Sequence, residues 1–189
     1  MMIPTVGGHV SGQQARRDDQ MLYLMIKPYA GQAAMMDGLR RTHGLSRQYA
    51  MDRFHMTLVP FGDIRLIPPQ NLELIRRAAA SLQAEPFEVT LNRISGNALV
   101  GSRMQALRDF QRSLAARLEA FGIDLPDYAF KPHASLTYEE WRPRNILVSP
   151  ISWQVRQLLL INSIHGKGHQ LLDSWNLEPR QGCLDFDPH

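Results

Sequence analysis

The chain has a single cysteine, Cys183, among its 189 residues. One cysteine excludes an intramolecular disulfide framework, and it also excludes a zinc site built on several cysteines. No apolar run approaches the roughly 20 residues that cross a bilayer. Residues 1–19 lack the positive-then-apolar pattern of a signal peptide. These absences predict a cytoplasmic protein with no membrane partner.

Lysine is also scarce, with three residues against 18 arginines. Nucleotide-activated ligases use a lysine in a Lys-x-Asp-Gly segment, and none of Lys27, Lys131 and Lys167 lies in one. Ligation through an activated lysine is therefore excluded. The formal net charge of +3 permits an anionic partner without demanding one. Because there is no extended basic run, a nucleic-acid footprint would be short.

A short phrase occurs twice in the chain. The segments His55-Met-Thr-Leu58 and His133-Ala-Ser-Leu136 both read His-x-(Thr/Ser)-Leu, and both lie in runs typical of β-strands. Strand side chains alternate between faces, so each histidine shares a face with the hydroxyl two residues later. Two such strands side by side would bring two imidazoles and two hydroxyls into one small space.

That set of groups suits phosphate chemistry. A neutral imidazole has a pKa near 6.5, so one histidine can take a proton from water while the other protonates a leaving oxygen. Hydroxyls can donate to the non-bridging phosphate oxygens, where negative charge grows. The predicted catalytic residues are His55 and His133. The predicted phosphate-binding residues are Thr57, Ser135, Lys131 and Arg53, and the predicted base-stacking residues are Phe61 and Tyr138.

The two phrases and their surroundings resemble the signature of the 2H phosphoesterase superfamily. Within it they resemble the bacterial 2′-5′ RNA ligase family, whose members are also called RNA 2′,3′-cyclic phosphodiesterases. The matching segments, in order, are Met21–Lys27, Phe54–Gly62, Phe130–Leu136, Leu158–Ser163, and then Gly168 with Leu171–Leu177. The chain departs from the pattern at Ser135, where threonine is commoner, and at Val59-Pro60, which replaces an aromatic-leucine pair. A proline there predicts an edge strand or a strand end.

The resemblance implies an activity, its partners and the roles of the two histidines. The implied activity is metal-independent hydrolysis of RNA 2′,3′-cyclic phosphate ends to 2′-phosphates, with reversible 2′-5′ ligation as its counterpart. No cofactor is implied, and the implied partners are RNA ends or small cyclic-phosphate nucleotides. His55 is preferred as the acid and His133 as the base, although the symmetry of the motifs leaves the polarity open. The sequence does not predict an oligomeric state.

Two other functions remain open at this stage. One is a phosphodiesterase that acts on a small cyclic nucleotide or an ADP-ribose cyclic phosphate. The other is a nucleotide- or RNA-binding module without catalysis. His165 and His169 have the i, i+4 spacing of metal ligands on a helix, but the glycines at 166 and 168 favour a turn instead. We predict no metal site.

The order of predicted elements favours an α+β fold. We expect two pseudo-symmetric lobes, each an antiparallel sheet with packed helices, with the active site in the cleft between them. Residues 1–20 are predicted to be disordered, 21–178 to form the two-lobed domain, and 179–189 to be a tail. The predicted strands are 21–27, 55–61, 87–94, 97–101, 134–138, 155–162 and 170–177, and the predicted helices are 32–42, one that opens at 68–69, and 103–121.

Overall fold

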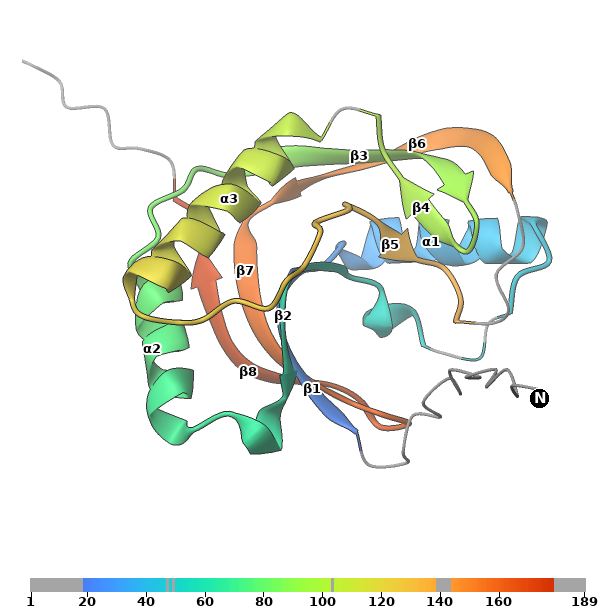
Figure 1. The fold of residues 1–189 in the computed structure, drawn as a ribbon. Coiled ribbons are helices and arrows are strands. Elements are labelled where there is room, and N and C mark those ends of the chain that lie inside the picture. Colours follow the sequence, from blue (N-terminus) through green and yellow to red (C-terminus); the bar gives the residue numbers. More distant parts are fainter. Residues whose placement is uncertain (1–18, 47, 49, 103, 139–143, 179–189) are drawn as a thin grey trace, which may run out of the picture.

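The computed structural model describes residues 19–178, apart from 47, 49, 103 and 139–143. Two four-stranded sheets and three α-helices make up this part of the chain, so the predicted α+β, two-lobed fold is confirmed (Figure 1). Sheet A has the order β2 (Met56–Asp63), β1 (Gln20–Ile26), β7 (Gln157–Ile164), β8 (Gly168–Asn176). Sheet B has the order β5 (Ala134–Ser135), β4 (Ala98–Val100), β3 (Phe87–Ser95), β6 (Asn145–Val155). The helices are α1 (Ala30–Thr42), α2 (Pro69–Ala80) and α3 (Gln105–Ala120), with short 3-10 turns η1 (Met51–Arg53) and η2 (Ile64–Leu66).

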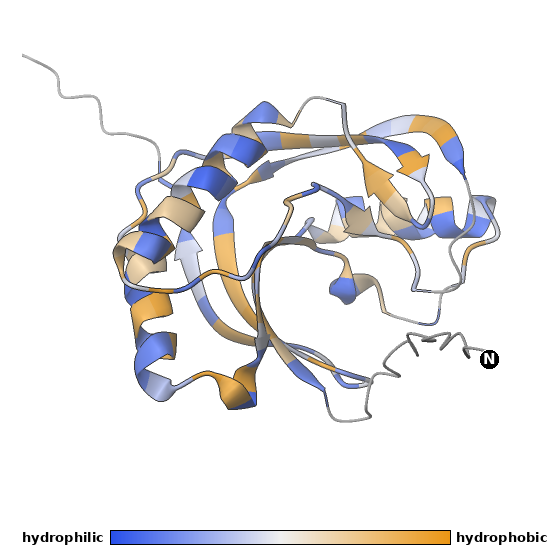
Figure 2. Ribbon diagram, viewed as in Figure 1, coloured by the Kyte–Doolittle hydropathy of each residue, from blue (hydrophilic) through white to orange (hydrophobic). Residues whose placement is uncertain are grey.

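Every strand pair in both sheets is antiparallel, and alternation along the strands separates a core face from a second face. On β1, Leu22, Leu24 and Ile26 are completely buried in the core. The apolar stripe predicted for α3 is buried as well, through Leu107, Phe110, Leu114 and Leu118. Figure 2 shows hydrophilic residues over much of the outer side of α3 and hydrophobic residues on the strands β4 and β5. No helix in the described part of the chain is long and apolar enough to cross a membrane.

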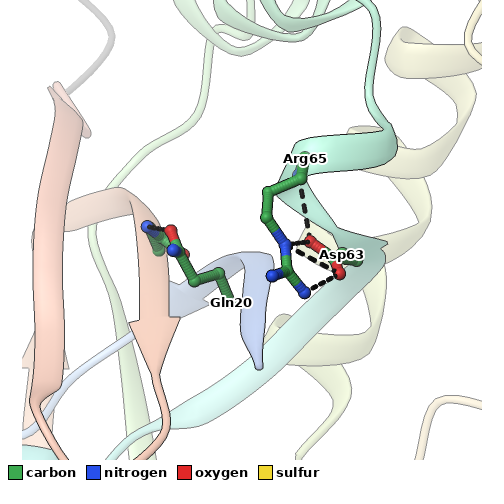
Figure 3. A network of polar contacts seen from close by, with 4 residues as sticks. Gln20, Asp63 and Arg65 are labelled. Atoms are coloured by element: carbon green, nitrogen blue, oxygen red, sulfur yellow. Dashed lines mark hydrogen bonds and ion pairs between the residues drawn. The ribbon is translucent and has the colours of Figure 1, made fainter. Parts of the chain in front are cut away.

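β2 is an edge strand of sheet A, as Pro60 predicted. Pro60 pairs with Tyr23 at a register shift, where a missing N–H is tolerated. The strand ends at Asp63, whose carboxylate accepts from the backbone N–H of Arg65 at 3.0 Å and pairs with its guanidinium (Figure 3). This contact caps η2 and fixes where the chain leaves the sheet.

Gln20 corrects the predicted start of the domain. Placed by the sequence in the disordered segment, it is the first residue of β1 and pairs with Ile164. Its side-chain oxygen accepts from the side-chain amide of Asn162 at 3.0 Å, and Gln20 itself is labelled in Figure 3. The ladder therefore orders Gln20 together with the strand. The rest of the predicted disordered segment, apart from Asp19, and all of the tail at 179–189 lie outside the described residues.

The sequence prediction missed β6 and overextended β5. β6 pairs with β3 along its length, but Pro150 argues against a strand. Two features resolve this: β6 is an edge strand, and Pro150 lies where the register shifts between Leu91 and Arg93. The predicted strand at 134–138 stops at Ser135, because the next two backbone N–H groups both turn to the carbonyl of Asn97, at 2.8 and 3.4 Å.

α1 joins the two lobes. It follows β1 of sheet A but contacts β6 of sheet B. The Tyr29 hydroxyl donates to the carbonyl of Gln154 at 2.9 Å, and the Gln32 amide donates to the carbonyl of Ser152 at 3.1 Å. This crossing fixes the position of one sheet relative to the other.

A buried ion pair lies on the inner side of α1. The Arg40 guanidinium donates to the carboxylate of Asp37 at 2.6 and 3.1 Å, and both residues are almost fully buried. The same guanidinium lies 4.7 Å from the ring centroid of Phe54, a cation–π contact. Phe54 is itself buried and directly precedes His55. The ion pair therefore supports the segment that leads into the first His-x-Thr-Leu phrase.

Candidate active site

His55 directly precedes β2 and is half-buried. Its Nδ1 lies 2.7 Å from the carbonyl oxygen of Arg53, so Nδ1–H donates to that carbonyl. In a neutral ring this places the single proton on Nδ1 and leaves Nε2 as the reactive nitrogen. The hydrogen bond also fixes the ring plane, since the carbonyl belongs to the short turn η1.

His133 repeats this arrangement in the other lobe. It directly precedes β5, and its Nδ1 lies 2.7 Å from the carbonyl oxygen of Lys131. In both phrases the acceptor is the carbonyl two residues before the histidine. Each phrase therefore orients its own imidazole through local backbone geometry, with Nε2 left for chemistry.

The two histidines are close enough to interact electrostatically. Burial is the main cause that lowers the pKa of His55 below 6.5. The positive charges of Lys27, His133 and Arg53 lower it further, while the hydrogen bond to the Arg53 carbonyl acts in the opposite direction. The fold thus brings together two imidazoles from different sheets, and it disfavours the charged form of His55 in the free protein.

Both predicted hydroxyls lie beside their histidines. Thr57 is the second residue of β2 and is half-buried, and strand alternation directs it to the same side as His55. Ser135 ends β5 and is also half-buried. Its hydroxyl hydrogen-bonds to the phenol of Tyr138. Each hydroxyl therefore follows its own histidine at the position from which alternation predicts a shared face, and its role at the site stays a prediction.

The other predicted site residues divide into two groups. Arg53 is half-buried, lowers the pKa of His55 and lines the neighbouring pocket. Tyr138 is 65% exposed and lines the same pocket. Lys131 is exposed and contributes its carbonyl, rather than a demonstrated side-chain contact, to the site. Phe61 is half-buried and packs against the hydrophobic core, and its role in base stacking stays a prediction.

A pocket of about 500 Å³ is lined by Arg53, and neither His55 nor His133 is among its lining residues. Arg53, Thr137 and Tyr138 line it on the side of the two motifs, and Tyr23 and Ser163 line it from sheet A. Burial raises the pKa of the Tyr23 phenol, and Tyr138 adds to this effect. Sequence reasoning overlooked Tyr23, although its alternation with Leu22 and Leu24 indicates that it points away from the core.

Sequence reasoning also missed Lys27 and His169 as site residues. The His169 ring meets the His55 ring edge to face, with centroids 4.9 Å apart and planes at 78°. The Nζ of Lys27 lies 3.4 Å from Nδ1 of His169. The predicted turn is confirmed, because β7 and β8 are joined through Gly166 and Gly168, both with positive φ. The predicted strand began at residue 170, so His169 was placed in the turn, although it is the second residue of β8.

Within the described residues, no group of three or more His, Cys, Asp or Glu side chains is arranged to hold a metal ion. The three clustered histidines have other geometry: two orient through backbone carbonyls and the third accepts from a lysine. The predicted lack of a metal requirement stays a prediction for experiment.

No protein-family model matches the sequence, and no curated protein matches it. Several solved structures share the fold. Escherichia coli LigT complexed with 3′-AMP matches with a TM-score of 0.68 and 19% identity, over 85% of this chain and 99% of that one. The protein TT0787 of Thermus thermophilus matches at 0.67 and 18%, over 85% and 100%. A structure described as a phosphoesterase matches at 0.66 and 18%, over 85% and 99%. LigT has also been solved with phosphate, ATP and NADP+.

Proposed function

We propose that the protein is a 2H phosphoesterase that hydrolyses 2′,3′-cyclic phosphates at RNA ends without a metal ion. The observation that carries the proposal is the matched pair of imidazoles. Each donates Nδ1–H to the carbonyl two residues upstream, at 2.7 Å, and each comes from a different sheet. A proton acceptor and a proton donor on two sides of a phosphate are what in-line displacement requires.

In this mechanism, Nε2 of one histidine removes a proton from water as the water oxygen attacks phosphorus. The bond from phosphorus to O3′ breaks, and Nε2 of the other histidine gives its proton to O3′. The product carries a 2′-phosphate. This regiochemistry rests on the sequence resemblance, since the matched geometry of the two histidines alone permits either bond to break. The same step with a 5′-hydroxyl as the nucleophile in place of water would break the P–O3′ bond and give a 2′-5′ linkage.

Thr57 and Ser135 are the proposed donors to the non-bridging oxygens. Each hydroxyl lies two residues after its histidine, so it can reach a phosphate held between the imidazoles. Arg53 supplies positive charge next to His55. Negative charge that grows on the phosphate in the transition state is then opposed by two hydroxyls and at least one cation.

The proposed substrate is the terminal nucleotide of an RNA in the cytoplasm, or a small cyclic nucleotide. The neighbouring pocket of about 500 Å³ is large enough for a nucleoside, and Tyr23 and Tyr138 give it aromatic surface for a base. Its limited size also favours the second candidate, a mononucleotide-sized substrate. The similar LigT structures hold 3′-AMP, ATP and NADP+, which are nucleotide ligands of comparable chemistry.

The test compares an oligonucleotide ending in a 2′,3′-cyclic phosphate with a 2′,3′-cyclic mononucleotide, and follows the products by ³¹P NMR. We expect both to give 2′-phosphates. His55→Ala and His133→Ala should each lose about 10²–10⁴-fold in rate, the usual contribution of one proton-transfer group. His43→Ala, at the end of α1, is the matched control and should remain active. Full activity in either motif variant would refute the two-histidine mechanism, and a 3′-phosphate product would refute only the regiochemistry.

A further inference from the structure

The mechanism proposed above leaves two groups beside His55 without a role, Lys27 and His169. In the β1–β2 ladder, Met25 pairs with Thr57 and Ile26 with Met56. Continuing that register by one pair sets Lys27 opposite His55. His169 is the second residue of β8, at the far edge of the same sheet, and its ring reaches across to the His55 ring.

His169 is suited to hold its neighbours rather than to transfer protons. Its pKa is lowered to about 3, chiefly by burial and then by the charges of His55, Lys27 and Arg53. The ring is therefore neutral throughout the neutral pH range. Because Nδ1 lies 3.4 Å from the Lys27 ammonium, which can only donate, the proton of the ring belongs on Nε2. The His169 ring therefore accepts a hydrogen bond from Lys27 and packs against the His55 ring, and these two contacts hold both neighbours in place.

Lys27 differs from the other two lysines of the chain. It is half-buried, whereas Lys131 and Lys167 are exposed. Burial is the main cause that lowers its pKa, and nearby Arg53 lowers it as well, while Asp52 acts in the opposite direction. A partly desolvated cation next to other cations gains most from a bound anion, since an anion relieves both effects at once. An ammonium has three N–H donors, so one can serve His169 while others reach an oxyanion.

We propose that Lys27 contacts the phosphate of the substrate, and that His169 is a positioning residue that holds both the Lys27 ammonium and the His55 ring. This inference deepens the proposed function and rests on it. The charged and titratable groups that face His55 are then Lys27 after β1, Arg53 in η1, His133 before β5 and His169 in β8. Lys27 supplies the charge that the sequence prediction assigned to Lys131.

The first experiment measures kcat/KM against pH for Lys27→Met, with Lys167→Met as the control. Lys167 lies exposed in the turn before β8, so its loss changes the net charge equally. We expect Lys27→Met to lose about 10–10³-fold, as for removal of one donor to developing charge. The limb of the profile that His55→Ala flattens should move to higher pH in Lys27→Met, because a positive neighbour of His55 is gone. The control should change neither the rate nor the limb.

Two substitutions separate the contacts of His169. His169→Phe keeps an aromatic ring against His55 but removes the acceptor for Lys27. His169→Gln keeps an acceptor but removes the ring. We expect His169→Phe to raise KM for the phosphate substrate, because Lys27 is then held less well. We expect His169→Gln to lower kcat, because His55 is then less ordered. If both variants change kcat and KM equally and leave the pH dependence of kcat/KM unchanged, then His169 only packs against its neighbours and does not position them.

The second experiment does not depend on turnover. Reductive methylation with ¹³C-formaldehyde keeps the lysine charges and gives signals only from the three lysines and the N-terminal amine. Titration with inorganic phosphate should shift the Lys27 signal, assigned by its loss in Lys27→Met, and leave the Lys167 signal in place. A wild-type protein that hydrolyses cyclic phosphates while Lys27 stays unshifted and Lys27→Met stays fully active overturns this inference alone. A wild-type protein that hydrolyses no cyclic phosphate overturns the proposed function instead.

Discussion

The buried pair of Asp37 and Arg40 allows a sharp prediction about stability. Both side chains are almost fully buried, and the guanidinium donates twice to one carboxylate oxygen, at 2.6 and 3.1 Å. Asp37→Ala removes the counter-charge and leaves the Arg40 guanidinium buried. Breaking a buried pair on one side costs about 3–5 kcal/mol. For a domain of this size, about 2–4 °C is lost per kcal/mol, so the melting temperature should fall by about 6–20 °C.

Arg41 provides a matched comparison for this prediction. It lies next to Arg40 and also approaches Asp37, at 3.9 Å, but its side chain is 63% exposed. An exposed ion pair contributes about 0–1 kcal/mol, so Arg41→Ala should be nearly neutral. A double variant, Asp37→Leu with Arg40→Met, replaces both charges with apolar groups. It should recover most of the stability that Asp37→Ala loses, because neither position then buries a charge.

The assays are thermal melting and urea unfolding, each followed by Trp fluorescence and circular dichroism, with the slope against urea concentration compared among variants. Equal losses of stability in Asp37→Ala and Arg41→Ala would show that burial does not determine the cost of removing a charge. A functional readout accompanies it. Because Arg40 lies 4.7 Å from the Phe54 ring, and Phe54 precedes His55, Arg40→Met alone should lower kcat as well as stability.

Four further predictions follow from the fold and the site. Thr57→Val, which keeps the shape of the side chain, should lose about 10–10³-fold in kcat; an unchanged rate would remove this hydroxyl from the mechanism. Gly101→Ala should destabilise by about 1–3 kcal/mol, because its Cβ would lie 2.1 Å from the carbonyl oxygen of Thr90. As its control, Gly38→Ala in α1, where nothing lies within 4 Å, should be neutral or stabilising in the same melts. Since the pKa of His169 falls from 6.5 to about 3 on folding, the unfolded chain binds more protons between these values. The free energy of unfolding should therefore drop as pH falls below 6.5. The drop should be smaller than the limit of about 1.4 kcal/mol per pH unit for one group, because solvent screens the partly exposed ring. His169→Gln should have a shallower dependence of stability on pH, and parallel curves for the variant and the wild type would contradict the assignment. Treatment with EDTA should leave turnover unchanged, and loss of activity that zinc or manganese restores would refute the metal-free mechanism.

The features that could be predicted from sequence were those encoded locally. Alternation around His55 and His133 predicted which side chains share a face, and Pro60 correctly predicted an edge strand. Helix limits followed from local stop signals, such as Gly122 with its φ of 80° after α3. In each case neighbouring residues decide the outcome, so the sequence pattern is sufficient.

The features that escaped prediction depend on residues far apart in the chain. His169 reaches His55 only because sheet A brings β8 and β2 to one site, and no local pattern encodes that contact. β6 was missed because Pro150 is acceptable only where the pairing with β3 shifts register. Arg40 belongs to a residue type that is mostly exposed, and only the packing of α1 against Phe54 explains its burial.

Because α1 crosses from one sheet to the other, the distance between the two imidazoles depends on how the two sheets are held together. Each histidine is tethered to its own backbone within three residues, so neither can adjust much by itself. The distance between them is then set by the contact between α1 and β6, where Tyr29 and Gln32 hydrogen-bond to the backbone of β6. Loss of these two hydrogen bonds would preserve the local geometry of each motif but change the distance between the two motifs. Substitutions at α1 would therefore change the distance between His55 and His133 without changing the local hydrogen bond of either ring.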